Sequence, residues 1–518
     1  MRVAVVGAGL AGLAAACHLR GRGHEVTVFE RAGQPGGRAG RIDRDGFVFD
    51  TGPTVMTMPE LLEEPLRAVG SSVEQAVPMR RLDPGYRAWY ADGSTLDARA
   101  DHDAMRAEIA RVCGERDAAA YDEFVPWLRR LYETELPHFI DANFDSPLDL
   151  LRSPAAALRL VRLGAFDRLG RKVGSYFADE RLVRLLSFQA LYAGLPPQRA
   201  LALYAVITYM DSVRGVWLPE GGMSAIPRGM ARAARDAGVD FRYDAPVARV
   251  LRRGDGAACG VELAAGSSAT SGRVAQRYAA DAVVLTPDLP TAYRELLPGV
   301  RAPRSARTGV YSPSCVVWHL GVRGAPPPQA AHHNIHFGRD WDAAFDALTR
   351  DGALMPDPSR LVSIHSLSEP SLAPAGCTTL YVLEPVPNLD GDVAWRTERA
   401  AIRDRLGAFL ADRGYPTDIV TEHLVDPLDW QADGMHRGTP FALAHLFAQT
   451  GPFRPGNLDR RVPGVVFAGS GTVPGVGVPM VLISGKLAAD RVDAYAGRRP
   501  ERPSGPLHPS RRGAGSTS

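Results

Sequence analysis

The sequence predicts an α/β protein built around a nucleotide-binding βαβ unit and extended by further structural units. The first observation is a β-branched run at residues 2–6, which ends in a glycine motif and is followed by an alanine-rich stretch to about residue 22. The second is another strand-like run at residues 26–29, which is closed by Glu30. The third is the length of 518 residues, which is long for a single hydrophobic core. These observations predict a Rossmann-type unit that fills part of the chain.

The glycine motif, residues 7–12, has the spacing of a dinucleotide fingerprint. Gly7 lets the chain turn sharply, Gly9 lets the backbone approach a pyrophosphate, and Gly12 lets the helix pack closely on the strand. The N-terminus of the helix offers free N–H groups and the positive end of its dipole to phosphates. Glu30 follows the second strand, where its carboxylate can accept a ribose hydroxyl. A secretory signal ending near Cys17 is the competing interpretation, and it explains neither the glycine spacing nor the acid.

Composition narrows the class of protein. A net charge of +2 creates no strong electrostatic field that would attract nucleic acid. A hydrophobic fraction of 45% is that of an ordinary globular protein. The five cysteines are scattered and odd in number, which argues against a disulfide framework and a zinc site and suits a reducing cytoplasm. No run of 18 apolar residues occurs, so we expect no transmembrane helix and no more than peripheral membrane contact.

The remaining elements follow from periodicity. Residues from about 100 to 215 are predicted to be mostly helical, because apolar residues recur three and four apart at 121–136 and 182–210. Further helices are expected at 391–413 and from about 478 to 496. The tail at 497–518 is rich in Pro, Gly, Ser and Arg and is predicted to be disordered. Short strands are expected at 47–49, 239–243, 247–251, 260–263, 281–285, 308–322, 361–367, 378–386 and 463–469.

Three more motifs accompany the fingerprint: Gly36-Gly37-Arg38, Asp50-Thr51-Gly52-Pro53, and the glycine-rich turn at 467–479. With the fingerprint they resemble the FAD-dependent amine-oxidase-like superfamily. More narrowly, the chain is similar to the bacterial and fungal carotenoid (phytoene) desaturases, and this similarity extends from residue 1 to about 496. The segments that carry the narrower match are 187–194, 215–223, 332–335 and 370–376.

The resemblance implies a discontinuous Rossmann-type FAD-binding domain at 1–70, 225–300 and 455–496. It also implies a mixed-sheet substrate domain at 71–110 and 301–454 and a helical, membrane-facing subdomain at 111–224. A helix that begins near Val478 would direct its positive end at the flavin. The residues expected to bind FAD are Gly7, Ala8, Gly9, Gly12, Glu30, Arg31, Gly37, Arg38, Gly52, Pro53, Thr54, Val247, Gly469, Gly471, Val478 and Pro479.

The implied activity is the introduction of C=C bonds into a C40 polyene, from phytoene to lycopene or to a partly desaturated intermediate. Three alternatives stay open: action on a different carotenoid, a flavin amine oxidase, and a non-catalytic carotenoid carrier. Only one ribose-binding fingerprint is present, so a bound nicotinamide is not expected and electrons would leave to oxygen or a quinone. The oligomeric state is not predicted.

A polyene needs an apolar tunnel, and aromatic residues are its candidate lining. In related desaturases an acid and an arginine near residue 150 are candidate active-site residues, which here are Asp149 and Arg152; an i,i+3 surface ion pair is the alternative. His332, His333 and His336 lack a carboxylate to complete a metal site, so no metal is predicted. The candidate lining residues are Phe188, Tyr192, Tyr204, Tyr209, Trp217, Phe337 and Trp341.

The segment at 152–172 combines arginines with interleaved apolar residues. A basic amphipathic helix of this kind can lie in a membrane interface, and a solvated helix face is the alternative. Because the substrate would be delivered from lipid, we expect a cytoplasmic protein that touches the membrane surface through this segment.

Overall fold

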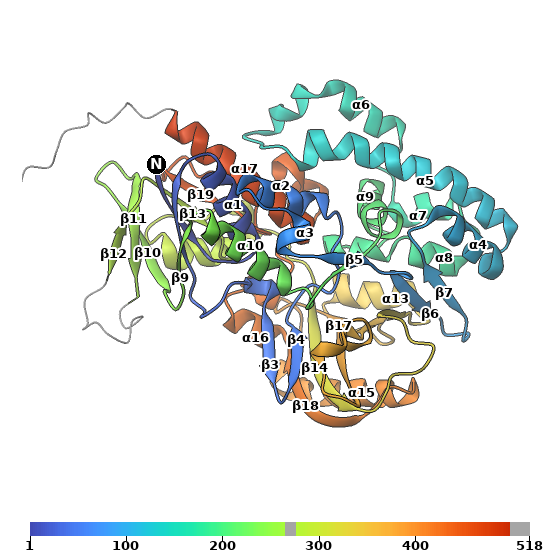
Figure 1. Ribbon diagram of the computed structural model, residues 1–518. Coiled ribbons are helices and arrows are strands. Elements are labelled where there is room, and N and C mark those ends of the chain that lie inside the picture. Colours follow the sequence, from blue (N-terminus) through green and yellow to red (C-terminus); the bar gives the residue numbers. More distant parts are fainter. Residues whose placement is uncertain (265–275, 498–518) are drawn as a thin grey trace, which may run out of the picture.

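The computed structural model describes residues 1–264 and 276–497 (Figure 1). Helices and a parallel sheet occupy one side of the molecule, a second sheet lies below, and a group of helices lies at the far end (Figure 1). The α/β class predicted from the sequence is confirmed. The prediction of disorder for the tail falls, apart from residue 497, outside the described residues.

A five-stranded parallel sheet forms one side of the molecule, called the parallel-sheet side below. Its strands are β1 (Arg2–Val6), β2 (Glu25–Phe29), β9 (Asp240–Arg242), β13 (Ala282–Leu285) and β19 (Val465–Phe467), in the order β19-β13-β1-β2-β9. The strands therefore come from three separated stretches of sequence. Around the sheet lie α1 (Leu10–Gly21), α2 (Glu60–Ala68), α3 (Val73–Ala76), α10 (Ala225–Asp236) and α17 (Val478–Ala496).

The core of this side explains its apolar sequences. The run from Leu13 to Cys17 in α1 is fully buried, because α1 is covered by the sheet and by α17. Small residues permit that contact: a Cβ at Gly12 would lie 2.1 Å from the Gly7 carbonyl oxygen, and one at Gly485 would lie 2.5 Å from the Ala11 carbonyl oxygen. Close packing of helix, strand and second helix thus depends on glycine and alanine at these positions.

A seven-stranded mixed sheet forms the second layer. In order, its strands are β18 (Asp418–Val425), β14 (Ser314–Arg323), β17 (Cys377–Val386), β16 (Arg360–Ser363), β15 (His333–His336), β6 (Tyr86–Trp89) and β7 (Thr95–Ala98). Alternate residues of β14 point to opposite faces. Trp318 and Leu320 pack against α15 (Trp395–Asp412), whereas His319 faces the central cavity.

Smaller elements complete the sheets. A three-stranded sheet contains β10 (Val247–Arg252), β11 (Ala258–Leu263) and β12 (Arg277–Ala279). The hairpin of β3 (Arg41–Arg44) and β4 (Phe47–Asp50) and the antiparallel pair of β5 (Met79–Arg81) and the distant β8 (Trp217–Pro219) form two small two-stranded sheets. The other short helices are α11 (Leu289–Thr291), η7 (Ala292–Leu296), α12 (Arg304–Thr308), α13 (Trp341–Asp346), η8 (Ala347–Asp351), α14 (His365–Ser368) and α16 (Pro427–Ala432).

The helical region extends from α4 (His102–Cys113) to η6 (Tyr209–Val213) and lies beside both sheets (Figure 1). Its longest helix, α5 (Glu115–Glu135), includes most of the predicted helix at 121–136 and continues as the π-helical turn η2 (Leu136–Ile140). Between α4 and η6 the shorter elements are η3 (Pro147–Arg152), α6 (Pro154–Arg162), α7 (Leu169–Gly174), α8 (Glu180–Leu185), η4 (Phe188–Ala193), η5 (Ala202–Tyr204) and α9 (Ala205–Thr208).

Several sequence-based boundaries were wrong. The strand expected at 308–322 begins only at Ser314, after α12 and a connecting segment. The predicted helix at 182–210 is broken into short pieces, because Gly194 has a φ of +74° and two prolines follow it. The segment 152–172 is likewise two helices, α6 and α7, separated by a turn at Gly164 with φ +69°. The strand expected at 361–367 ends at Ser363, and α14 follows.

Candidate functional site

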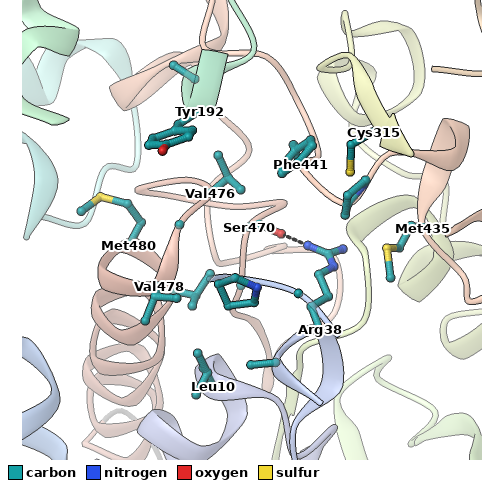
Figure 2. Close-up of a pocket in the computed structure, with 18 of the residues that line it drawn as sticks. Leu10, Arg38, Tyr192, Cys315, Met435, Phe441, Ser470, Val476, Val478 and Met480 are labelled. Carbon is teal, nitrogen blue, oxygen red and sulfur yellow. Dashed lines mark hydrogen bonds between the residues drawn. The ribbon is translucent and has the colours of Figure 1, made fainter. Parts of the chain in front are cut away.

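A cavity of about 1580 Å³ lies where the two sheets and the helical region meet. Figure 2 shows part of its wall, with side chains from α1, from the turn before α17 and from the seven-stranded side pointing into the same space. The wall is polar and glycine-rich near the carboxyl ends of β1 and β2 and largely apolar toward the helical region. The cavity therefore has two chemically different ends.

The glycine motif forms the first end. Gly9 is the N-cap of α1 and has no side chain to satisfy the first N–H groups of the helix, which border the cavity. A Cβ at Gly9 would lie 3.9 Å from the Gly36 carbonyl oxygen and from the Gly37 Cα, so it would be in ordinary contact with the second glycine loop. Free helix N–H groups that border a cavity fit a pyrophosphate.

Glu30 lies at the end of β2 and is buried beside the glycine motif. One carboxylate oxygen, Oε2, accepts the backbone N–H of Ala8 at 2.7 Å, and Oε1 accepts that of Ala32 at 2.9 Å. These two bonds fix the carboxylate on the cavity wall, where each oxygen retains acceptor capacity for a hydroxyl.

Arg38 joins the glycine loop to the C-terminal turn. Its guanidinium donates to the hydroxyl of Ser470 (Figure 2) and lies 3.7 Å from a carboxylate oxygen of Asp288. Both Arg38 and Ser470 line the cavity. The arginine thus places a positive charge on the wall next to the glycine motif.

The C-terminal turn ends where α17 begins, at Val478, as the sequence predicts. Its N-cap, Gly477, has no side-chain cap, so the free N–H groups and positive dipole end of a 19-residue helix border the cavity. Negative charge in this part of the cavity is therefore stabilised.

Most of the sixteen predicted cofactor residues are brought together on one wall. Ala8, Gly12 and Gly471 are behind it: Ala8 donates to Glu30, and a Cβ at Gly12 or Gly471 would collide with Gly7 or Leu289. The residues on the wall are Gly7, Gly9, Glu30, Arg31, Gly37, Arg38, Gly52, Pro53, Thr54, Val247, Gly469, Val478 and Pro479.

Among the lining residues of this end that sequence reasoning missed are Thr286 and Ser470. Thr286 directly follows β13, and its hydroxyl donates to the Val6 carbonyl at 2.8 Å. Its place at the carboxyl end of a parallel strand was the available signal, because ligands of such sheets bind at that edge.

Aromatic residues dominate the second end. Five of the seven predicted lining residues are on the wall: Phe188, Tyr192, Tyr204, Phe337 and Trp341. The predictions for Tyr209 and Trp217 were wrong, because neither side chain lines the cavity. Tyr209 packs on Tyr132, with ring centroids 5.0 Å apart, and Trp217 belongs to β8 and packs into the core of the parallel-sheet side.

An apolar rim, defined as Leu148, Leu151, Leu158, Val161, Phe166 and Phe447, is exposed beside this end of the cavity. Leu148 and Leu151 are each 72% exposed, and the rings of Phe166 and Phe447, which also line the cavity, lie 6.3 Å apart. The exposed side chains of Arg159, Arg162 and Arg168 share this surface region. Exposed large apolar side chains that gather in one region are typical of a surface that contacts a partner or a membrane.

Asp149 and Arg152, the predicted catalytic pair, are on η3 and do not belong to the residues that line the cavity. They form an ion pair of 2.8 Å, and Asp149 Oδ2 accepts the backbone N–H groups of Asp145 and Ser146. The bond from Asp145 is the main reason why the pKa of Asp149 is lowered. This is the geometry of a helix cap and a surface ion pair, and the catalytic role stays a prediction.

Two buried carboxyl groups on the apolar wall were not predicted, Glu135 at the end of α5 and Asp211 in η6. Oε1 of Glu135 has no hydrogen-bond partner among the described residues, and burial raises the pKa of this carboxyl well above its usual value. Asp211 accepts hydrogen bonds, and burial raises its pKa to about 7. At Asp211 a single acid within the otherwise uncharged, largely apolar run 201–213 was the available sequence signal, whereas Glu135 lies in a stretch with other charged residues and offered no such signal.

Of the three histidines for which no metal is predicted, His333 and His336 make hydrogen-bond contacts, whereas both ring nitrogens of His332 are buried without a partner among the described residues. Both ring nitrogens of His333 lie 3.1 Å from backbone carbonyls, those of Gly85 and Thr54, and His336 Nε2 lies 2.9 Å from the Tyr415 hydroxyl. Within the described ranges, no group of three or more His, Cys, Asp or Glu is arranged to hold a metal ion. In the same part of the chain, no helix combines the length and the apolar character that a membrane span requires.

Comparisons with known proteins agree with this geometry. The family of flavin containing amine oxidoreductases matches residues 10–493. The chain is 50% identical over 496 residues to a phytoene dehydrogenase of Streptomyces griseus, and the aligned residues cover 95% of this chain and 94% of that protein. It is 38% identical over 504 residues to a zeta-carotene-forming phytoene desaturase of Myxococcus xanthus, covering 96% and 94%. Its fold is similar to an oxidoreductase structure from Methanosarcina mazei, with a TM-score of 0.60, 16% identity and coverage of 95% and 100%.

Proposed function

We propose, from the premise that the chain belongs to the family of flavin containing amine oxidoreductases, that this FAD-dependent oxidoreductase is a carotenoid desaturase. Its substrate would be a C40 polyene, phytoene, and its product lycopene or a partly desaturated intermediate. The printed names of the relatives from Streptomyces griseus and Myxococcus xanthus support this substrate. The extent of desaturation is left to experiment.

The two-ended cavity is the observation that carries the proposal. Its volume of about 1580 Å³ exceeds the roughly 300–1,000 Å³ of a typical small-molecule site. It therefore offers room for a dinucleotide and for a second, apolar molecule. Aromatic and aliphatic walls suit a polyene that carries no polar handle.

The residues of the cavity wall would have distinct roles in holding FAD. The N–H groups at the start of α1, next to Gly9, would bind the pyrophosphate, and Glu30 would accept a ribose hydroxyl. Arg38 adds a charge-assisted contact, and the start of α17 favours negative charge on the flavin. The other contacts come from the predicted set of motif residues on the same wall. When bound, FAD supplies the acceptor for a hydride.

The apolar rim and its arginines would dock the enzyme on the cytoplasmic surface of a membrane. Exposed leucine and phenylalanine side chains beside the apolar end of the cavity support this proposal, because a polyene dissolved in lipid could then enter without crossing water. Oxygen or a membrane quinone would accept the electrons, with no nicotinamide involved. The membrane contact and the electron acceptor are both proposals that go beyond the family assignment.

Expression in a host that accumulates phytoene tests the substrate. We expect the accumulated phytoene to be replaced by coloured polyenes, which chromatography and absorption spectra identify. Unchanged phytoene would contradict the proposal if the purified protein contains FAD. Hydrogen peroxide production from amines but not from phytoene would instead support an amine oxidase.

A further inference from the structure

We propose that Asp211 accepts the proton that desaturation removes from the polyene, with Ser212, Gln189 and Tyr86 holding its carboxylate in place. This inference rests on the proposed function and adds to it the base of the reaction. Asp211 lines the cavity, is 3% exposed, and belongs to η6, which continues directly from α9.

The reaction requires such a base. A C=C bond forms when two neighbouring saturated carbons each lose a hydrogen. One hydrogen leaves with its electron pair as a hydride, which passes to FAD. The other leaves as a proton, and the electron pair of its C–H bond becomes the new π bond. FAD is thereby reduced by two electrons and the polyene is oxidised by two, so one proton remains for a group on the cavity wall.

Few groups on the apolar wall can take that proton. Among the lining residues contributed by the helical region, the carboxyl groups are Glu135 and Asp211. The predicted acid, Asp149, is engaged in its cap outside the lining. A base must lie within hydrogen-bond reach of the proton it removes, so among the carboxyls of the helical region the choice is between Glu135 and Asp211.

Hydrogen bonds distinguish these two carboxyls. Oδ1 of Asp211 accepts the Ser212 hydroxyl at 2.7 Å and the Gln189 amide at 3.3 Å. Its Oδ2 lies 3.5 Å from the Tyr86 hydroxyl. Donors to a carboxylate favour the charged form, which is the form that accepts a proton. Glu135 has an unpartnered oxygen and no such donors among the described residues, which favours its neutral form.

Asp211 also lies on the cofactor side of the apolar wall. The Tyr86 ring is 5.5 Å from that of His333, whose Nε2 contacts the Thr54 carbonyl, and Thr54 is one of the predicted FAD residues. The Tyr86 ring also packs on Phe188, which packs in turn on Tyr192, with ring centroids 5.7 and 5.8 Å apart. Tyr192 lines the cavity together with Val476 of the turn before α17 (Figure 2). The carboxylate thus borders the region where hydride transfer would occur.

Among the titratable side chains around Asp211, burial shifts the pKa of each neighbouring phenol further from neutrality, whereas it raises the pKa of Asp211 toward neutrality. Tyr86 of β6 and Tyr192 of η4 are buried, which raises the pKa of each phenol further above neutrality. Helix α5 packs against η6 and contributes Tyr132, whose pKa is raised to about 12 by burial, and Glu135, whose pKa burial raises well above its usual value. Arg214, which follows η6, pairs with Glu60 at 2.6 Å. A base with a pKa near the working pH is the most effective.

Anaerobic single-turnover flavin reduction tests the proposal. The FAD-loaded protein is mixed with phytoene in phosphatidylcholine vesicles, and loss of the visible flavin band is followed. We expect Asp211→Asn to slow flavin reduction by roughly 10²- to 10⁴-fold with unchanged FAD content and vesicle binding. Asp122→Asn is the matched control, because Asp122 is an exposed residue of α5 that pairs with Arg106. In this control variant the flavin should be reduced by phytoene at the wild-type rate.

The pH profile separates a base from a structural residue. The carboxylate must be ionised, so the wild-type rate should rise about tenfold per pH unit below the pKa of Asp211 and level off above about pH 7. Asp211→Glu should keep this rise, whereas Asp211→Asn should lose it. If Asp211→Asn fails to retain FAD, the wild-type profile and Asp211→Glu decide the matter.

Three results would overturn the inference. They are a full rate in Asp211→Asn, a wild-type rate that does not change between pH 5 and 8, and a large loss in Asp149→Asn with none in Asp211→Asn. If phytoene fails to reduce the flavin of the wild-type protein, the proposed function itself fails, and that outcome is distinct from these three.

Discussion

Replacing Leu148 and Leu151 with glutamine should detach the protein from neutral membranes. Both side chains belong to the apolar rim and are 72% exposed, so nearly three-quarters of each is available to enter lipid. Full burial of a leucine is worth about 2 kcal/mol, so each side chain contributes about 1.4 kcal/mol at this exposure. The pair then accounts for about 3 kcal/mol, which corresponds to roughly 100-fold in partitioning.

Co-sedimentation with phosphatidylcholine vesicles measures this change. The bound fraction at several lipid concentrations gives the partition coefficient, which should fall by roughly 100-fold in the double variant. FAD content should be unchanged, because neither residue lines the cavity. Leu367→Gln is the matched control: Leu367 is 47% exposed on α14, away from the rim. Equal binding of the double variant and wild type would refute the reasoning, and so would an equal loss in the control.

Three further predictions follow from the site. Replacing Arg159, Arg162 and Arg168 with glutamate should weaken binding to anionic vesicles by about 1 kcal/mol per arginine removed, most strongly at low salt; salt-independent or unaltered co-sedimentation would contradict a charged contact. Glu30→Ala should weaken FAD binding by about 1–3 kcal/mol because a ribose hydroxyl loses its acceptor, which fluorescence titration measures, and an unchanged dissociation constant would exclude Glu30. Turnover should proceed with oxygen or a quinone and without NAD(P), and oxygen uptake or quinone reduction monitors it; dependence on NAD⁺ alone would be incompatible with a single fingerprint.

Local sequence patterns were sufficient for the parallel-sheet side. The run from β1 through the glycine motif and α1 to Glu30 uses interactions between residues close in sequence, so its glycines, helix start and terminal acid could be read directly. The start of α17 at Val478 followed from the glycine- and proline-rich turn before it. In both places backbone geometry, rather than packing against distant segments, decides the structure.

In the helical region, local sequence patterns were not sufficient to predict the structure. Apolar periodicity predicted one helix at 182–210, but Gly194 and the two following prolines divide it, and neighbouring elements then determine how each piece packs. Periodicity also cannot tell a buried apolar face from an exposed one. Leu158 and Val161 of α6 have the spacing of core residues and are nonetheless exposed.

The sequence by itself determined the α/β class, the glycine fingerprint with its acid and the cofactor-side turn, because each depends on short-range backbone constraints. Only the tertiary structure decided which acids face the apolar cavity. Asp149, a candidate from the resemblance to related desaturases, caps η3, whereas Glu135 and Asp211 reach the wall from separate helices. Burial and hydrogen bonding of a carboxyl depend on residues far away in sequence, such as Tyr86 beside Asp211, and no local pattern encodes that contact.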